Sequence, residues 1–150
     1  MYSPSGWPRI RPARKAVDRV YIPVLIPNVI LCVDDEPTAL MVRRLILSIS
    51  GYDVLTAADG DAALTSLCRN HVDLVITDHF LPDRTGAQVA AEMKRLKPDV
   101  PIVLLTGELE PPPGSENADL VLPKGLDPPE FLATIANLIT KRQSSEIEMS

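Results

Sequence analysis

Four short apolar runs, each followed by a reactive polar side chain, constrain the fold of this chain more than any other feature. The runs lie at residues 29–33, 74–77, 102–105 and 120–123. Unbroken apolar runs of this length are typical of parallel strands that helices cover on both faces. We therefore expect an α/β domain in which a parallel sheet is buried between two helical layers.

The side chains that follow these runs carry the chemistry. They are Asp34, Asp35, Asp78, Thr106 and Lys124. The carboxyl ends of parallel strands meet at one edge of a sheet, and ligands bind just beyond that edge. We therefore expect three carboxylates, a hydroxyl and an ammonium group in one pocket, although they are spread from residue 34 to residue 124.

The remaining segments alternate between helix and strand signals. Pro37 opens a helix with a wide apolar stripe, and Gly51 ends it. A strand over residues 53–57 and a helix over 61–70 follow. Gly86 leads into a helix that continues to residue 97, and Pro128 opens a last helix that ends near Lys141.

The fourth crossover breaks this alternation. Three consecutive prolines, at residues 111–113, lie between Thr106 and Leu120. Proline lacks a backbone donor and clashes with the preceding helical turn. We therefore expect a proline-rich loop where the fourth helix of the alternating pattern would stand.

Charge is distributed unevenly along the 150 residues, although the net charge is only −5. Residues 1–27 carry five basic side chains and one acidic side chain, while the rest of the chain is strongly acidic. An acidic body argues against nucleic acid as the principal ligand. We expect a basic, proline-rich and disordered extension at residues 1–27, one domain at 28–141 and a polar tail at 142–150.

The apolar stretch at residues 20–33 is too short to cross a bilayer, and prolines interrupt it. The sequence has no evident signal peptide, so we expect a cytoplasmic protein without a membrane span. Cys32 and Cys68 form no CxxC motif, which argues against a disulfide and against a zinc site.

The expected pocket needs a cation. Two carboxylates about 5 Å apart repel each other by roughly 3 kcal/mol at an effective dielectric constant near 20. Mg²⁺ prefers oxygen ligands and shares its coordination sphere with phosphate. With Lys124 and the Thr106 hydroxyl beside the acids, this pattern favours phosphoryl transfer with Asp78 as the nucleophile. Taken singly, each residue has an ordinary explanation, such as a helix cap or a solvated lysine, and only their joint placement supports a site.

Over residues 28–140 the sequence resembles a known family, the receiver domain of two-component response regulators. The matching segments are ILCVDDE at 30–36, GYDV at 51–54, DLVITDHFLP at 73–82, PIVLLTG at 101–107 and ADLVLPK at 118–124. The resemblance implies the doubly wound, flavodoxin-like receiver fold, with five parallel strands in the order 2-1-3-4-5.

The resemblance also implies a role for each residue. Asp78 would accept a phosphoryl group from a sensor histidine kinase or a histidine phosphotransfer protein. Asp35, Asp78 and the backbone carbonyl of Phe80 would bind Mg²⁺, and Asp34 would hold the ion largely through water. Lys124 would pair with the phosphoryl oxygens and Thr106 would move to hydrogen-bond them, so that the protein signals to a protein partner by a change in conformation.

The sequence departs from the family pattern at three places. Gly125 follows the lysine where proline is usual, Val121 replaces a frequent aromatic residue, and the proline-rich loop replaces the fourth helix. The signal would therefore leave through another face or through the loop itself. Phe80 lies two residues after Asp78, where its ring would hinder attacking water, so we expect a fairly long-lived phosphorylated form.

Three functions remain open from the sequence. The first is a stand-alone phosphoacceptor module that is not a conventional enzyme, because no output domain follows residue 150. The second is a receiver-like interaction module that is not phosphorylated in use. The third, a Mg²⁺-dependent phosphohydrolase, lacks an evident general acid. We assign no role to His71 or His79, since Mg²⁺ takes oxygen ligands.

Overall fold

The computed structural model describes residues 26–149, so the expectation for the N-terminal extension lies almost wholly outside the described residues. Five parallel strands form one sheet in the order β2-β1-β3-β4-β5, as predicted. The strands are β1 (Val29–Val33), β2 (Asp53–Ala57), β3 (Leu74–Asp78), β4 (Ile102–Thr106) and β5 (Leu120–Pro123).

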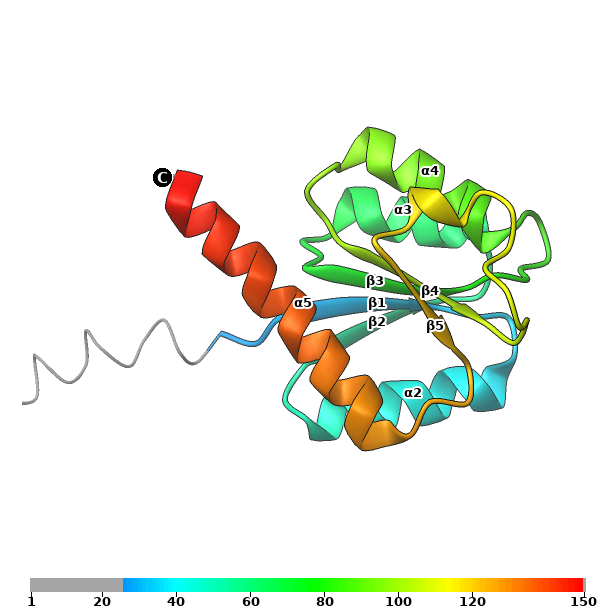
Figure 1. Ribbon diagram of the computed structural model, residues 1–150, viewed down its shortest axis with the longest axis horizontal. Helices are drawn as coiled ribbons and strands as arrows, with labels where there is room; N and C mark the ends of the chain where they lie inside the picture. Colours follow the sequence, from blue (N-terminus) through cyan, green and yellow to red (C-terminus); the bar gives the residue numbers. More distant parts are fainter. Residues whose placement is uncertain (1–25, 150) are drawn as a thin grey trace, which may run out of the picture.

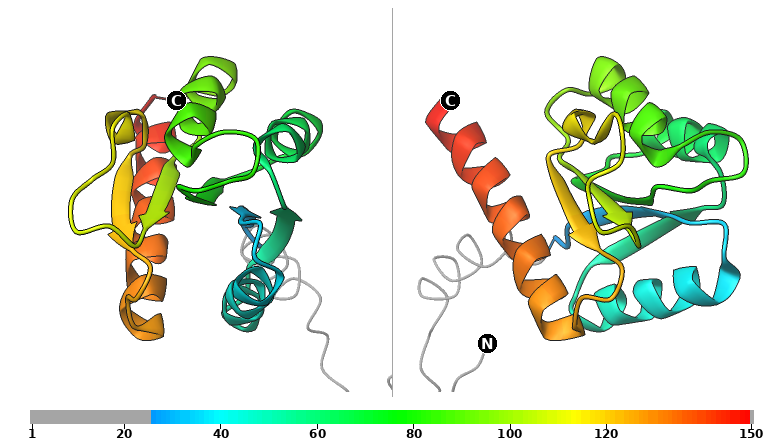
Figure 2. Two further views of the ribbon diagram at one scale, coloured as in Figure 1. Left: turned by 90° about the vertical axis from the view of Figure 1, so that its right-hand side faces the viewer. Right: turned by 45° about the vertical axis from the view of Figure 1, so that its right-hand side comes forward.

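Two layers of helices enclose the sheet (Figure 1). Helices α3 (Gly60–Arg69) and α4 (Gly86–Leu96) cover one face, and α2 (Pro37–Ile49) and α5 (Pro128–Met149) cover the other (Figure 2). Side chains cap the helix starts, because the first turn of a helix leaves backbone N–H groups without partners. Glu36 caps α2, Asp59 caps α3, and Thr85 forms a capping box with Gln88 at the start of α4.

Each face of the sheet has its own hydrophobic core, because successive side chains of a strand point to opposite faces. Leu31 and Val33 of β1 pack in the core beneath α3 and α4, whereas Ile30 and Cys32 pack in the core beneath α2 and α5. All residues of β3 and β4 are buried. The last residues of these two central strands, Asp78 and Thr106, are therefore held firmly by the surrounding core.

The fourth crossover contains no α-helix, which confirms the prediction from the three prolines. Its only helical piece is one 3-10 turn, Ser115–Asn117. Gly114 precedes this turn with a φ of +85°, and an added Cβ there would lie 3.1 Å from the Cβ of Ala87 on α4. The loop is therefore folded closely against α4, at a position where glycine suits both the backbone angle and the space.

The last helix is longer than predicted. The expectation that α5 ends near Lys141 is wrong, since the helix continues to Met149. Phe131, Ile135 and Ile139 form its buried stripe, and Arg142 follows on the same face. The Nη1 of Arg142 donates to the backbone carbonyl and to Oδ1 of Asp73, at 3.1 and 3.2 Å. This contact keeps the helix on the sheet beyond its last buried apolar residue.

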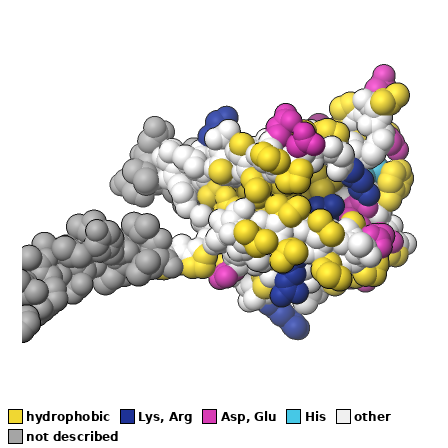
Figure 3. All heavy atoms as spheres, turned by 90° about the horizontal axis from the view of Figure 1, so that it is seen from below, with side chains coloured by type: hydrophobic (Ala, Val, Ile, Leu, Met, Phe, Trp, Pro, Cys, Tyr) yellow, Lys and Arg dark blue, Asp and Glu magenta, His cyan; other side chains and the backbone are white. Residues whose placement is uncertain are grey.

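The apolar stripe predicted for α2 is only partly buried. Leu47 is fully buried, but the outer face of the helix exposes several large hydrophobic side chains. These exposed side chains are Met41, Val42, Leu45 and Ile49. Figure 3 shows hydrophobic side chains gathered across this side of the molecule.

Within residues 26–149, none of the helices has both the length and the hydrophobicity that a bilayer crossing requires.

The two cysteines should differ sharply in reactivity. Burial raises the pKa of the Cys32 thiol in β1 to about 12, whereas Cys68 is exposed on α3. Because the thiolate is the reactive form, we expect one thiol per chain to react with a disulfide reagent at about pH 8 in native protein, and two in denaturant. Absorbance of the released thiolate measures this. A second fast-reacting thiol in native protein would contradict the packing of β1.

Candidate functional site

The register of the sheet brings the ends of four strands level. Val33 of β1 lies opposite Thr77 of β3, and Thr106 of β4 lies opposite Pro123 of β5. β3 and β4 are paired through Asp78 at the same level. The residues predicted to form a site all lie at or directly beyond this edge, namely Asp34, Asp35, Asp78, Thr106 and Lys124.

Three carboxylates form a cluster at this edge. Asp34, Asp35 and Asp78 each offer an oxygen, and these three oxygens lie within 4.8 Å of one another. Asp34 and Asp78 are only 1% and 3% exposed, while Asp35 faces solvent. At this separation each pair of ionised carboxylates repels by about 3 kcal/mol at an effective dielectric constant near 20.

Two cations offset part of this repulsion. Lys124 Nζ lies 2.9 Å from Asp78 Oδ2, and Arg43 Nη1 lies 3.3 Å from Asp34 Oδ2. Arg43 is not among the residues predicted from the sequence. It lies between Leu40 and Leu47 on the inward face of α2, and a charged residue within an apolar stripe is the signal that could have revealed it.

The donor set fits a hard divalent cation. Two cations face three carboxylates, so the cluster retains an excess of negative charge. The other oxygen of Asp78, Oδ1, is buried and accepts no hydrogen bond from any described residue. A buried acceptor without a partner costs about 1–3 kcal/mol, and a bound cation would remove that cost. Carboxylate oxygens around one unpaired, buried oxygen are the ligands that Mg²⁺ favours.

The Thr106 hydroxyl joins the site to the proline-rich crossover. Thr106 is buried at the end of β4, and its Oγ1 accepts a hydrogen bond of 3.1 Å from the backbone N–H of Glu108. Any movement of this hydroxyl therefore changes the first contact of the loop that begins at Gly107. Leu109, next along the loop, is fully exposed.

Phe80 and His79 lie on the loop after β3. The Phe80 side chain is 57% exposed, and its ring stands edge-on to the buried His79 ring at a centroid distance of 4.9 Å. Phe80 also forms an isolated antiparallel bridge with Thr85. His71 lies away from the site, with Nε2 2.8 Å from Asp73 Oδ1 at the start of β3.

An apolar hollow of about 340 Å³ borders Lys124, between α2 and the start of α5. Its lining consists mainly of aliphatic side chains and proline rings, with two cationic side chains at the site. The lining includes Ala39, Val42, Arg43, Ile46, Pro123 and Lys124. The acidic cluster is therefore flanked by an apolar surface on the α2 side.

The fold and the acidic edge together define the class of protein. A family model for the response regulator receiver domain matches residues 30–136, and the chain belongs to this family. A crystal structure of a CheY-like receiver domain protein from Methanospirillum hungatei JF-1 superposes with a TM-score of 0.76 at 25% identity, over 80% of this chain and 99% of that one. The response regulator TrrA from Thermotoga maritima, crystallised in complex with Mg²⁺-BeF, gives a TM-score of 0.70 at 33% identity. This match covers 74% of this chain and 98% of that one.

Curated relatives are longer than this chain. The probable transcriptional regulator ycf27 of Cyanophora paradoxa is 36% identical over 119 residues, which cover 77% of this chain and 49% of that protein. The response regulator SaeR of Staphylococcus aureus (strain USA300) is 31% identical over 116 residues, which cover 75% of this chain and 50% of that protein. The chain thus spans about half the length of these two relatives, and the match concerns their receiver portion.

Magnesium should stabilise the folded protein through the acidic cluster. A ligand present at ten times its dissociation constant adds about 1.4 kcal/mol to the free energy of unfolding, which corresponds to a rise of a few degrees in Tm. We expect Asp35→Asn to abolish this rise in thermal denaturation. Asp53→Asn is the matched control, because Asp53 is exposed at the opposite end of β2. An equal rise in Tm for Asp35→Asn and the wild type would contradict the site.

Proposed function

We propose that this receiver domain accepts a phosphoryl group on Asp78 and signals the event to a protein partner. The observation that carries the proposal is the state of the Asp78 carboxylate. One oxygen is held by Lys124 at 2.9 Å, and the other is buried without a partner beside Asp34 and Asp35. A nucleophile, a fixed positive charge and a set of metal ligands are the components that phosphoryl transfer needs.

The metal ligands in this proposal are Asp35, Asp78 Oδ1 and the backbone carbonyl of Phe80, with Asp34 acting largely through water. Mg²⁺ bound there would supply positive charge for the oxygens of the phosphoryl group. Arg43 holds the Asp34 carboxylate from the α2 side. This pairing leaves Asp35 as the exposed ligand that a solvated ion meets first.

The chemical step belongs to Asp78. Oδ2, which Lys124 contacts, attacks phosphorus and forms the acyl phosphate, while Oδ1 would remain available to hold Mg²⁺. The P–N bond of the donor phosphohistidine breaks at the same time, and the imidazole nitrogen leaves with the bonding electron pair and takes up a proton. Lys124 is placed at Oδ2, so its ammonium group lies next to the phosphoryl oxygens as they gain contact with the protein.

The Thr106 hydroxyl transmits the change. It accepts from the Glu108 N–H and also has one proton to donate, which a phosphoryl oxygen at Asp78 would accept. Rotation of the hydroxyl toward the phosphoryl group alters its bond to Glu108. In this proposal the loop at residues 107–119 is therefore the segment that a downstream protein reads.

The proposed donors are a sensor histidine kinase or a histidine phosphotransfer protein, in the cytoplasm. Support comes from the surface of α2, which exposes Met41, Val42, Leu45 and Ile49. Of these, Val42 also lines the apolar hollow at Lys124. An exposed apolar patch of this kind is typical of a protein–protein contact. The acidic charge of the chain favours a protein partner over nucleic acid.

Incubation with Mg²⁺ and a small phosphodonor such as acetyl phosphate tests the proposal. We expect a stoichiometric, acid-stable and base-labile adduct on the wild type by intact mass, and none on Asp78→Asn. Asp53→Asn, far from the site, should be phosphorylated normally. No adduct on the wild type would favour an interaction module that works without phosphorylation. Multiple turnover of a phosphoester would favour a phosphohydrolase.

Phe80 should lengthen the life of the phosphorylated form. Its ring is exposed two residues after Asp78, where it hinders water more than a polar side chain would. We expect Phe80→Asn to speed dephosphorylation about tenfold, equivalent to about 1.4 kcal/mol in the barrier. Phosphate release over time measures the rate, and Leu109→Asn on the neighbouring loop serves as the control. An unchanged rate in Phe80→Asn would remove this role.

A further inference from the structure

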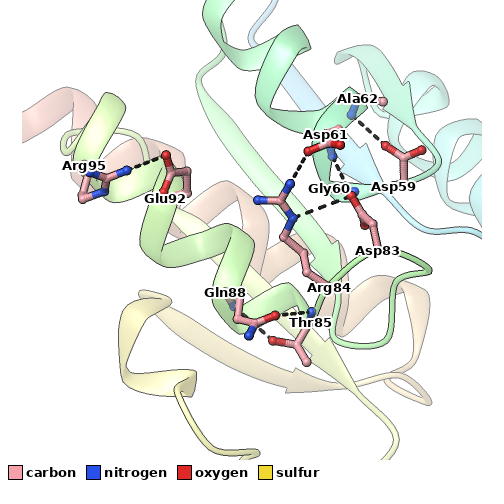
Figure 4. Close-up of polar contacts among 10 residues, drawn as sticks. All are labelled: Asp59, Gly60, Asp61, Ala62, Asp83, Arg84, Thr85, Gln88, Glu92 and Arg95. Carbon is pink, nitrogen blue, oxygen red and sulfur yellow. Dashed lines mark hydrogen bonds and ion pairs between the residues drawn. The ribbon is translucent and has the colours of Figure 1, made fainter.

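The loop that carries Phe80 is hydrogen-bonded to the start of helix α3, which lies earlier in the chain. This loop joins β3 to α4 over residues 79–85 and reaches across to α3 (Figure 4). Asp83 Oδ1 accepts from the Gly60 N–H at 2.9 Å, and Oδ2 accepts from the Asp61 N–H at 3.0 Å. The hydrogen bond from Gly60 is the main reason that the pKa of Asp83 lies below its usual value.

Arg84 forms a second connection between the same two segments. Its Nη2 pairs with the carboxylate of Asp61, and its Nε lies 3.6 Å from Asp83 Oδ2 (Figure 4). The two segments approach closely, since an added Cβ at Gly60 would lie 3.0 Å from Arg84 Nε. We call the contacts of Asp83 and Arg84 with Gly60 and Asp61 the clasp.

Helix α3 already has a capping residue of its own. Asp59 Oδ1 accepts from the Ala62 N–H at 2.7 Å, as an N-cap side chain does. The clasp supplies acceptors for the N–H groups of Gly60 and Asp61. These acceptors are the two oxygens of Asp83, which lies more than twenty positions further along the chain. Its distinctive effect is therefore to tie the loop to the helix.

Apart from the clasp and from Leu81, which packs against the core beneath α3 and α4, the loop is closed on itself. The Gly86 N–H donates to the His79 carbonyl at 2.6 Å, and Phe80 bridges to Thr85. At its far end, an added Cβ at Gly86 would lie 2.2 Å from the Asp78 carbonyl oxygen. The base does not reach residues 83 and 84, and the clasp is the polar contact that holds this outer part of the loop.

We propose that Asp83 and Arg84 are positioning residues, which keep the Phe80 carbonyl in place for the metal by holding the tip of this loop. The inference rests on the proposed function, because it assumes that Phe80 is a metal ligand. The clasp touches neither the metal nor the phosphoryl group, and it acts only through the loop. Groups that orient a ligand in this way commonly change metal affinity by about 10–100-fold when they are removed.

The competing explanation is that Asp83 merely stabilises the start of α3. Both explanations predict a less stable protein after Asp83→Ala. They differ in metal affinity, because only the clasp connects this carboxylate to the loop with Phe80. Asp59→Ala is the matched control, since it removes a cap from the same end of the same helix and leaves the loop contacts intact.

Isothermal calorimetry with Mg²⁺ alone tests the proposal on the whole chain, with urea unfolding measured in parallel. We expect Asp83→Ala to weaken Mg²⁺ binding about tenfold. Asp59→Ala should bind as the wild type does, although it also loses stability. Arg84→Gln should show a smaller loss of affinity, and Asp83→Asn, which keeps one acceptor oxygen, should recover part of it. Wild-type affinity in Asp83→Ala, or an equal loss in Asp59→Ala, would overturn the clasp.

Hydrogen exchange in metal-free protein provides an independent readout. The Gly86 amide is bonded to His79 at the base of the loop, so its exchange reports on loop opening. We expect faster exchange at Gly86 in Asp83→Ala and no change in Asp59→Ala. If the wild type binds no Mg²⁺, the proposed function fails and positioning of a ligand fails with it. The exchange data then still decide whether the clasp holds the loop, and equal exchange in both variants would refute it.

Discussion

The balance of charge at the carboxyl edge of the sheet is the interaction on which the rest of this structure depends. Three carboxylates stand within 4.8 Å of one another because strands β1 and β3 end side by side there. The buried strands prevent them from moving apart, and Lys124 and Arg43 neutralise two of the three charges. What remains is a negative site with one unpaired buried oxygen, which is unfavourable alone and favourable with a bound cation. This imbalance of charge is the physical basis of the divalent-ion binding and the phosphoryl transfer that we propose.

Much of the fold could be predicted because its signals are local. Apolar runs mark buried strands, and parallel strand ends must converge, so Asp78 and Lys124 could be placed together without any structure. The prolines at 111–113 likewise excluded the fourth helix. Arg43 and Asp83 were harder to find, since their roles depend on which distant group each one meets. The full length of α5 could not be predicted for the same reason, because its polar last turns are held by a contact of Arg142 with the distant Asp73.

The proline-rich crossover changes how this receiver domain can use its site. In place of a helix, a loop packs on α4 through Gly114 and leaves Leu109 exposed. The Thr106 hydroxyl is bonded directly to the first turn of that loop. One hydrogen bond therefore connects the end of β4, beside the acidic cluster, with a loop that reaches the surface at Leu109.

The attachment of α5 through Arg142 and Asp73 has a practical consequence. Asp73 lies just before β3, at the end of the sheet opposite to the carboxylates, and α5 continues beyond Arg142 to Met149. A fluorescent reporter tethered beyond Met149 would stand well clear of the carboxylate edge of the sheet and of the crossover loop. Such a fusion could record encounters with other proteins without covering the surface that we propose for them.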